Sequence, residues 1–180
     1  MKKIFKNTCF VIVLGVILSI PLGRNVKVNA EEVLELNYEE STDTLTISGT
    51  GTLKKDDLAE KLKELNTQRN DKKASRADHV IIEEGITKLG ANSLDYAFFT
   101  VESIKTITFP KSLKSCSKKL FLGCENLVQI KNNSSISITN APGNDNDNMP
   151  GYWVCNGKII NEDKYKEKIV IPPKSTARLR

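Results

Sequence analysis

The sequence predicts a mainly β protein with short helices, built as a solenoid of few stacked units and preceded by a β-hairpin and one amphipathic helix. The main support is an internal repeat: from residue 80 to residue 94, apolar residues recur at five positions with an offset of 27. Alternating apolar residues at 33–53 add a hairpin, and one short stretch at 56–70 has helical spacing. A unit of this length cannot bury its apolar face alone, so neighbouring units must stack.

Residues 1–30 have the three parts of a secretory signal peptide. Lys2, Lys3 and Lys6 are followed by an uncharged apolar run of about 15 residues, Thr8–Leu22, and Val28-Asn29-Ala30 is a small-residue cleavage site. An uncleaved membrane anchor is the alternative, but a membrane span needs about 20 apolar residues. We therefore expect a secreted or cell-surface protein with no membrane span after cleavage.

Charge and composition exclude two classes of function. The formal net charge of +5 comes from five residues of the signal segment, and the remaining chain is neutral. A neutral chain lacks the basic surface that nucleic acid requires, so we expect no nucleic-acid partner. One His, one Trp and 6% aromatic residues also argue against a rich catalytic pocket.

Two elements are expected before the repeat. Residues 31–55 form a β-hairpin cap, because apolar residues alternate on both sides of the polar turn Glu39–Asp43. Residues 56–78 form a surface helix and a loop, and Asp56 lies where a helix start favours negative charge. The helix has one narrow apolar stripe, which consists of Leu58, Leu62 and Leu65.

Residues 79–139 contain the repeat units. In each unit a short strand, Val80–Ile82 or Ile107–Phe109, is followed by a turn and a second apolar pair. Cys116 takes the position of Leu89, which predicts a small buried apolar residue. The predicted core consists of Val80, Ile82, Ile86, Leu89, Ile104, Ile107, Phe109, Leu113, Phe121, Leu127 and Ile130.

Residues 140–151 are expected to be a linker, and residues 152–180 a C-terminal hairpin with a partial repeat. Asn156-Gly157 between two apolar runs is a strong hairpin signal. Ile169–Pro172 repeats the sequence pattern of the strand at Ile107–Pro110, which we call the strand phrase. The alternative interpretation of the linker is a Ca²⁺-binding loop, because the side chains at 144–148 carry oxygen atoms that suit this cation. The Gly and Glu that an EF-hand loop needs are missing there.

At these residues the sequence resembles the BspA-like leucine-rich repeats of bacterial surface and secreted proteins. The second unit matches at Ile107, Phe109, Pro110, Leu113, Leu120-Phe121, Cys124, Leu127 and Ile130, and the first at Val80, Ile82, Ile86, Leu89, Gly90 and Ile104. Ser93-Leu94 and Cys116-Ser117 depart from the pattern. The resemblance covers about residues 33–131 and weakly 152–173. It implies a curved leucine-rich-repeat solenoid that binds proteins or host surfaces and has no catalytic residues.

No arrangement typical of catalysis or metal binding is recognised in the sequence. His79, the only imidazole, lies beside Asp78 at a strand entry. Adjacent acids such as Glu83 and Glu84 point to opposite faces of a strand, which disfavours paired-carboxylate hydrolysis. The spacing of Cys116, Cys124 and Cys155 does not suit zinc, and it leaves disulfide formation open. We therefore expect no catalytic residue, no cofactor and no metal.

Two features favour binding. The basic cluster Lys111, Lys114, Lys118, Lys119 and Lys131 suits an anionic partner such as an acidic glycan, or is a solvated face. Tyr152 and Trp153 either cap the end of the repeats or form a carbohydrate platform. The sequence thus predicts an exported, non-catalytic binding or adhesion module for a protein or glycan at the cell surface. The alternative is a truncated or accessory repeat region of a larger secreted enzyme or cell-wall protein.

Overall fold

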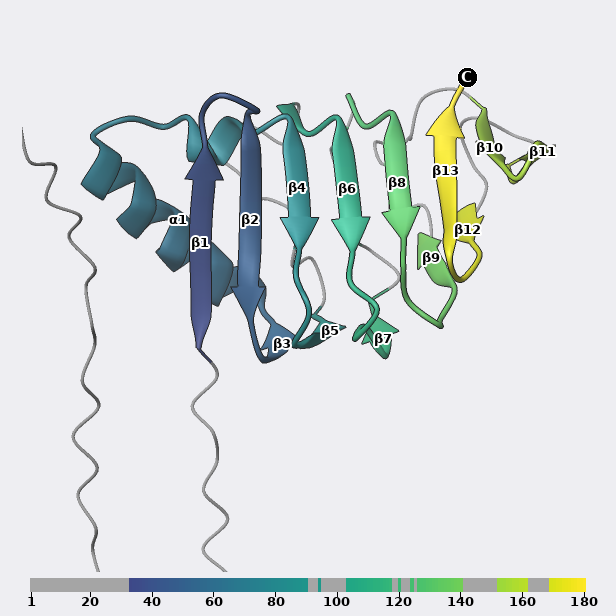
Figure 1. Cartoon of the computed structure of the whole chain (residues 1–180), viewed down its shortest axis with the longest axis horizontal. Coiled ribbons are helices and arrows are strands. Elements are labelled where there is room, and N and C mark those ends of the chain that lie inside the picture. Colours follow the sequence, from purple (N-terminus) through teal and green to yellow (C-terminus); the bar gives the residue numbers. More distant parts are fainter. Residues whose placement is uncertain are drawn as a thin grey trace, which may run out of the picture. The chain divides into compact units, whose positions relative to one another are not determined.

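An eight-stranded β-sheet is the frame of the molecule (Figure 1). The computed structural model describes residues 33–90, 94, 103–117, 120, 124, 126–140, 152–161 and 169–180. The strand order of this main sheet is β1-β2-β4-β6-β8-β13-β10-β11. Its strands are β1 (Leu34–Glu39), β2 (Thr44–Gly49), β4 (His79–Ile82), β6 (Thr106–Phe109), β8 (Gln129–Asn132), β13 (Ser175–Leu179), β10 (Trp153–Cys155) and β11 (Lys158–Ile159).

The main sheet is mixed. Its middle strands β2, β4, β6 and β8 run parallel, whereas β1 at one end and β13, β10 and β11 at the other pair antiparallel. In the parallel part, Leu45, Val80, Ile107 and Ile130 are successive partners across four strands. The offset of 27 in the sequence therefore places equivalent residues of β4 and β6 side by side.

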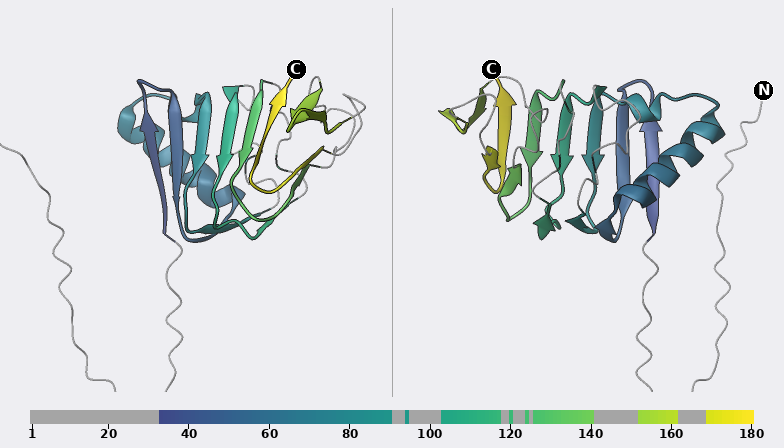
Figure 2. Two further views of the ribbon diagram at one scale, coloured as in Figure 1. Left: turned by 45° about the vertical axis from the view of Figure 1, so that its right-hand side comes forward. Right: turned by 180° about the vertical axis from the view of Figure 1, so that it is seen from behind.

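Smaller elements close the other sides of the core. A three-stranded sheet consists of β3 (Gly51–Leu53), β5 (Ile86–Leu89) and β7 (Ser115–Cys116), and a two-stranded sheet pairs β9 (Ile138–Asn140) with β12 (Ile169–Ile171). The helix α1 (Lys55–Arg69) crosses the core side of β1 and β2, and the 3-10 turn η1 (Ala74–Arg76) follows it (Figure 2).

Local sequence signals explain the hairpins and the helix. β1 and β2 pair around the predicted turn, and β10 and β11 meet at Asn156-Gly157, whose positive φ angles of 50° and 77° suit a two-residue hairpin turn. In α1, Leu58 and Leu62 are fully buried and Asn70 ends the helix in the left-handed region. These predicted elements are confirmed.

The core lies between the main sheet, the smaller sheets and α1. Ten of the predicted core residues are at most 1% exposed: Val80, Ile82, Ile86, Leu89, Ile104, Ile107, Phe109, Leu113, Leu127 and Ile130. Phe121, the eleventh, lies outside the described residues. Cys116 pairs with Leu89 as the repeat predicts, but its side chain is only half-buried.

The predicted solenoid of leucine-rich-repeat units is wrong, although the mainly β class fits. The chain forms one mixed sheet with two smaller sheets, and among the described residues α1 is the one α-helix. The strand phrase Ile169–Pro172 does not follow β8 in the sheet; its strand β12 pairs antiparallel with β9. The backbone then turns at Lys174, with φ of 50°, so that β13 enters beside β8 in the opposite direction.

Candidate functional site

The side of the main sheet away from α1 presents rows of side chains from successive strands. Because side chains alternate between the two faces of a strand, the residues between the buried core positions point outward. One such row crosses five strands through direct register partners: Thr46, Ile81, Thr108, Lys131 and Thr176. We call this surface, from β1 to β10, the outer face.

A second row of the outer face is linked by side-chain hydrogen bonds. His79 Nδ1 lies 2.8 Å from Thr106 Oγ1, and Arg178 Nε donates to Gln129 Oε1 at 3.1 Å. His79 is thus a half-buried residue at the start of β4, and its ring contacts Thr106 on the neighbouring strand. These contacts fix the directions of side chains that project from adjacent strands.

The two ends of the outer face differ in charge. On β1 the exposed residues that alternate with buried Tyr38 include Glu35 and Glu39. At the opposite end the exposed charges are basic, with Lys131 on β8 and Arg178 on β13. An anionic ligand is therefore favoured at the β8–β13 end and repelled at the β1 end.

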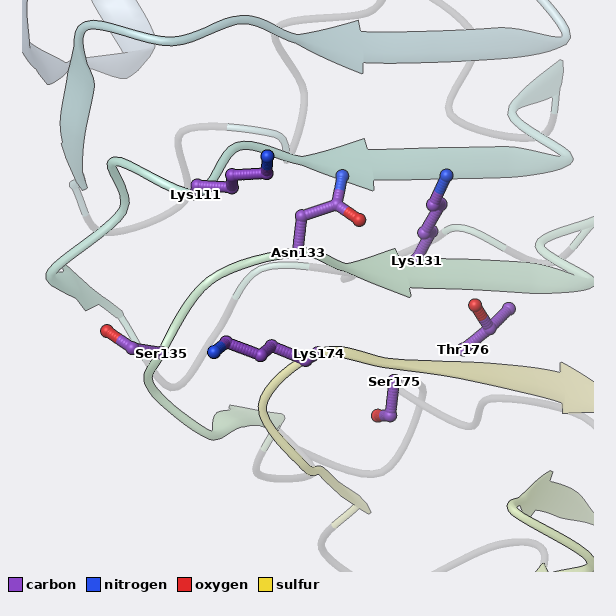
Figure 3. A pocket seen from close by; sticks show the side chains of 7 residues that line it. All are labelled: Lys111, Lys131, Asn133, Ser135, Lys174, Ser175 and Thr176. Atoms are coloured by element: carbon purple, nitrogen blue, oxygen red, sulfur yellow. The ribbon is translucent and has the colours of Figure 1, made fainter.

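An open hollow of about 590 Å³ lies at this basic end, and Figure 3 shows its lining. Its residues come from the loop after β6, from β8 and its following loop, and from β13: Lys111, Lys131, Asn133, Ser135, Lys174, Ser175 and Thr176. The side chains of Lys111, Lys131 and Asn133 point to one side, and the Lys174 ammonium points toward Ser135. Among the described residues of this lining, three are cations and none is acidic.

A second hollow of about 420 Å³ adjoins the first, because both are lined by Lys174, Ser175 and Thr176. Its other lining residues are Val154, Asn156, Gly157, Arg178 and Arg180. We call the two hollows together the basic groove. Its five cations are Lys111, Lys131, Lys174, Arg178 and Arg180.

Buried Asn132 positions the loop that carries Lys174. Its Nδ2 lies 2.9 Å from the carbonyl oxygens of both Ile136 and Pro172, and its Oδ1 accepts hydrogen bonds from Ser134 N at 3.1 Å and Ser134 Oγ at 2.6 Å. Lys174 N in turn donates to the Ser134 carbonyl at 3.2 Å. A buried amide that satisfies several backbone groups fixes one local geometry, so the groove is held by the fold itself.

The cations of the basic groove are unpaired within the described part of the chain. Some surface cations elsewhere have carboxylate partners, such as Lys105 with Asp78 and Arg69 with Glu40. Glu84 attracts the charge of Lys111, and its carboxylate accepts the backbone N–H groups of Lys111 and Ser112, both at 2.9 Å. The bond from the Lys111 backbone is the main cause that lowers the Glu84 pKa, so this carboxylate is already engaged.

The structure brings part of the predicted basic cluster together in space. It brings Lys111 and Lys131 to one hollow, while Lys114 lies apart, with its backbone N–H on the Thr87 carbonyl at 2.8 Å. Lys118 and Lys119 lie outside the described residues. Sequence reasoning missed Lys174, Arg178 and Arg180. The two-residue spacing of Thr176, Arg178 and Arg180 was the available signal, because it puts all three on one face of a strand.

Tyr152 and Trp153 have different environments. Trp153 is fully buried in β10 and belongs to the core, whereas Tyr152 is 45% exposed. Tyr152 N donates to the Arg180 carbonyl at 3.3 Å and Arg180 N donates to the Tyr152 carbonyl at 2.8 Å. The two residues are thus cross-strand partners, so Tyr152 lies beside Arg180 of the basic groove, although it is not among the residues that line either hollow.

Other predicted sites received no support. The Ca²⁺ loop at 144–148 lies outside the described residues, as do most of the linker and the signal segment 1–30. Among the residues that the structure describes, no group of three His, Cys, Asp or Glu side chains could hold a metal, and no helix is long and apolar enough to cross a membrane. No disulfide joins Cys116, Cys124 and Cys155, and burial raises the pKa of the Cys116 thiol.

Comparisons with known proteins identify no relative of this chain. The chain matches no protein-family model, no curated protein and no solved structure. The arrangement itself supplies fixed positive charges and hydrogen-bonding groups on a rigid sheet. Such an arrangement can hold an anionic ligand in a defined orientation.

Proposed function

We propose that this protein is exported and acts as a non-catalytic binding module for a protein or glycan at the cell surface. The outer face of the main sheet is the proposed binding surface. The observation that carries this proposal is the basic groove, whose five cations are unpaired within the described residues. Placing like charges together without partners is unfavourable for the free protein, and a ligand of opposite charge would relieve that cost.

The rigidity of the surface supports binding as well. A ligand that meets strands of a hydrogen-bonded sheet does not have to order a loop, so less entropy is lost on association. Thr108 and Lys131 are register partners on neighbouring strands, and their buried neighbours Ile107 and Ile130 anchor them from below. The outer face is thus pre-organised over several strands.

The sequence supports two further parts of the proposal, export and family membership. The signal-like segment 1–30 supports a secreted or cell-surface location. The resemblance of the repeat phrase to BspA-like proteins supports a role in binding, and membership of that family remains a proposal.

The test blocks the outer face without changing its charge. Thr108→Trp places a bulky side chain in the middle of the outer face, and Val170→Trp is a matched control on an exposed position of β12. The chain, purified after secretion from a bacterial host, is labelled and titrated onto intact bacterial and animal cell surfaces. We expect saturable binding that Thr108→Trp weakens at least about tenfold and Val170→Trp leaves unchanged. Absence of saturable binding, or equal effects of both variants, would contradict the proposal.

A further inference from the structure

We propose that the basic groove binds an acidic polysaccharide, a chain of sugar rings that carry carboxylate or sulfate groups. This inference rests on the proposed function, because it names the partner of the same surface. It depends on three independent properties of the described residues: the layout of the cations, the polar side chains between them and an exposed aromatic ring at one end.

The layout of the cations suits a ligand with several separated negative charges. Along β13, Thr176, Arg178 and Arg180 point to one face at intervals of about 6.6 Å, since a strand rises about 3.3 Å per residue. Across the sheet, Lys131 adjoins Thr176 as its register partner, about 4.8 Å away in the strand-to-strand direction. The positive charges therefore form a band, whereas a single small anion would occupy only part of it.

The polar side chains of the groove suit hydroxyl groups. Asn133, Ser135 and Thr176 line the first hollow, and Asn156 lines the second. Amides and hydroxyls both donate and accept hydrogen bonds, as sugar hydroxyls do. A ligand with carboxylates alone would use the cations and leave these groups to water. A polyhydroxylated anion uses both kinds of group.

Tyr152 favours a ligand made of rings. It is 45% exposed, its neighbour Trp153 is buried on the core side, and it is the cross-strand partner of Arg180. The negative face of an aromatic ring attracts the weakly positive C–H groups of a flat apolar surface, which a sugar ring offers. Val154, opposite Arg178, extends this apolar edge along β10. Tyr152 and Val154 thus supply exposed apolar surface beside Arg180 and Arg178.

The acidic end of the outer face limits where such a ligand can lie. Glu35 and Glu39 on β1 repel a polyanion, and the neutral row of Thr44, Thr46, Thr106 and Thr108 separates them from the basic groove. The ligand is therefore centred on β8, β13 and β10, next to Thr108 of β6, the register partner of Lys131. Its position is set by charge, and its chemical class by the hydroxyl-bonding groups and the tyrosine.

The test compares polymers that differ in one property at a time. Binding of the secreted chain to heparin and to polygalacturonate is measured by calorimetry, beside polyglutamate, polyphosphate and neutral dextran. Polyglutamate is a charged peptide, polyphosphate has no rings, and dextran has rings without charge. We expect saturable binding of heparin or polygalacturonate that weakens as salt is raised, at least about tenfold weaker binding of the other three polymers, and a preference between the first two that separates sulfate from carboxylate.

Variants assign the binding to the groove. Neutralising Lys131, Lys174 and Arg178 together as glutamines should weaken polysaccharide binding at least about tenfold, while Lys63→Gln, Lys72→Gln and Lys88→Gln make the same charge change elsewhere and should leave it intact. Tyr152→Ala should weaken polysaccharide binding severalfold and leave any residual polyphosphate binding unchanged.

Two results would overturn the inference. One is equal affinity for polyglutamate and both polysaccharides, with no effect of Tyr152→Ala. The other is cell-surface binding that Thr108→Trp abolishes, in a chain that binds neither polysaccharide. The second result would leave the proposed binding function standing and reject only the acidic polysaccharide as its partner.

Discussion

Val80 of β4 and Ile107 of β6 are direct register partners in the parallel part of the sheet, 27 residues apart in the chain. Both side chains are at most 1% exposed. The sequence repeat thus becomes a physical neighbour relationship, in which each strand buries the apolar flank of the next. The outward side chains between them, such as Thr106 and Thr108, are aligned by the same register.

Ile107→Asp should prevent cooperative folding. The side chain is fully buried, and an aspartate there would place an unpaired charge in the core at a cost of several kcal/mol. Thr108→Asp is the matched control, because Thr108 is the next residue and points outward. Circular dichroism during urea unfolding measures both variants. A cooperative transition of Ile107→Asp at the wild-type midpoint would refute this packing.

Gly85→Ala should destabilise the fold more than Gly157→Ala. Both glycines have positive φ angles, 107° and 77°, so both substitutions strain the backbone by about 1 kcal/mol. A Cβ at Gly85 would also lie 2.3 Å from the Gly49 carbonyl oxygen, whereas no atom lies within 4 Å of a Cβ at Gly157. The loss of unfolding free energy in Gly85→Ala minus the loss in Gly157→Ala therefore measures the cost of the clash with Gly49. Equal losses would show that the end of β2 at Gly49 and the turn at Gly85 approach less closely than described.

Asn132→Leu should loosen the loop before β13. The substitution keeps the branching and the number of side-chain heavy atoms but removes the side-chain hydrogen bonds to the Ile136 and Pro172 carbonyls, leaving part-buried acceptors unsatisfied. We expect a loss of about 2–4 kcal/mol in unfolding free energy, against less than about 1 kcal/mol for half-buried Asn133→Leu. Hydrogen exchange should rise at residues 174–176 in the first variant. Unchanged exchange there would show that Asn132 does not hold this loop.

Stability should fall between pH 10 and pH 12 because of Tyr38. Burial, and then the hydrogen bond to Asp43 at 2.6 Å, raise the pKa of Tyr38 from 10.0 to about 12. The folded state therefore keeps the proton where the unfolded state loses it, so this contribution is complete below pH 10 and is lost as pH rises to 12. Tyrosinate absorbance gives the pKa by difference from Tyr38→Phe. A Tyr38 that titrates near pH 10 would contradict the described burial.

Elements that depend on residues close to one another in the sequence were predictable. The turn at Asn156-Gly157 and the apolar stripe of α1 are local signals, and both elements form where they were expected. The repeat offset also matches the pairing of β4 with β6, because both strands bury the same alternate positions.

The end of the sheet was not predictable in this way. The strand phrase Ile169–Pro172 resembles the earlier strands, yet β12 pairs with β9, and the turn at Lys174 depends on contacts with Asn132 and Ser134 forty residues earlier in the chain. Three of the five cations of the basic groove were missed for the same reason. Lys111 and Lys131 were grouped from their closeness in sequence, whereas Arg178 joins them only through the antiparallel pairing of β13 with β8.

The most direct test of the account is hydroxyl-radical footprinting of the purified chain with and without saturating heparin or polygalacturonate. The account predicts protection of residues 129–135, 152–156 and 174–180, which form the basic groove and its tyrosine end, and unchanged reactivity of α1 at Lys55–Arg69. Protection centred on α1 or β1, with the groove as reactive as in the free protein, would contradict it.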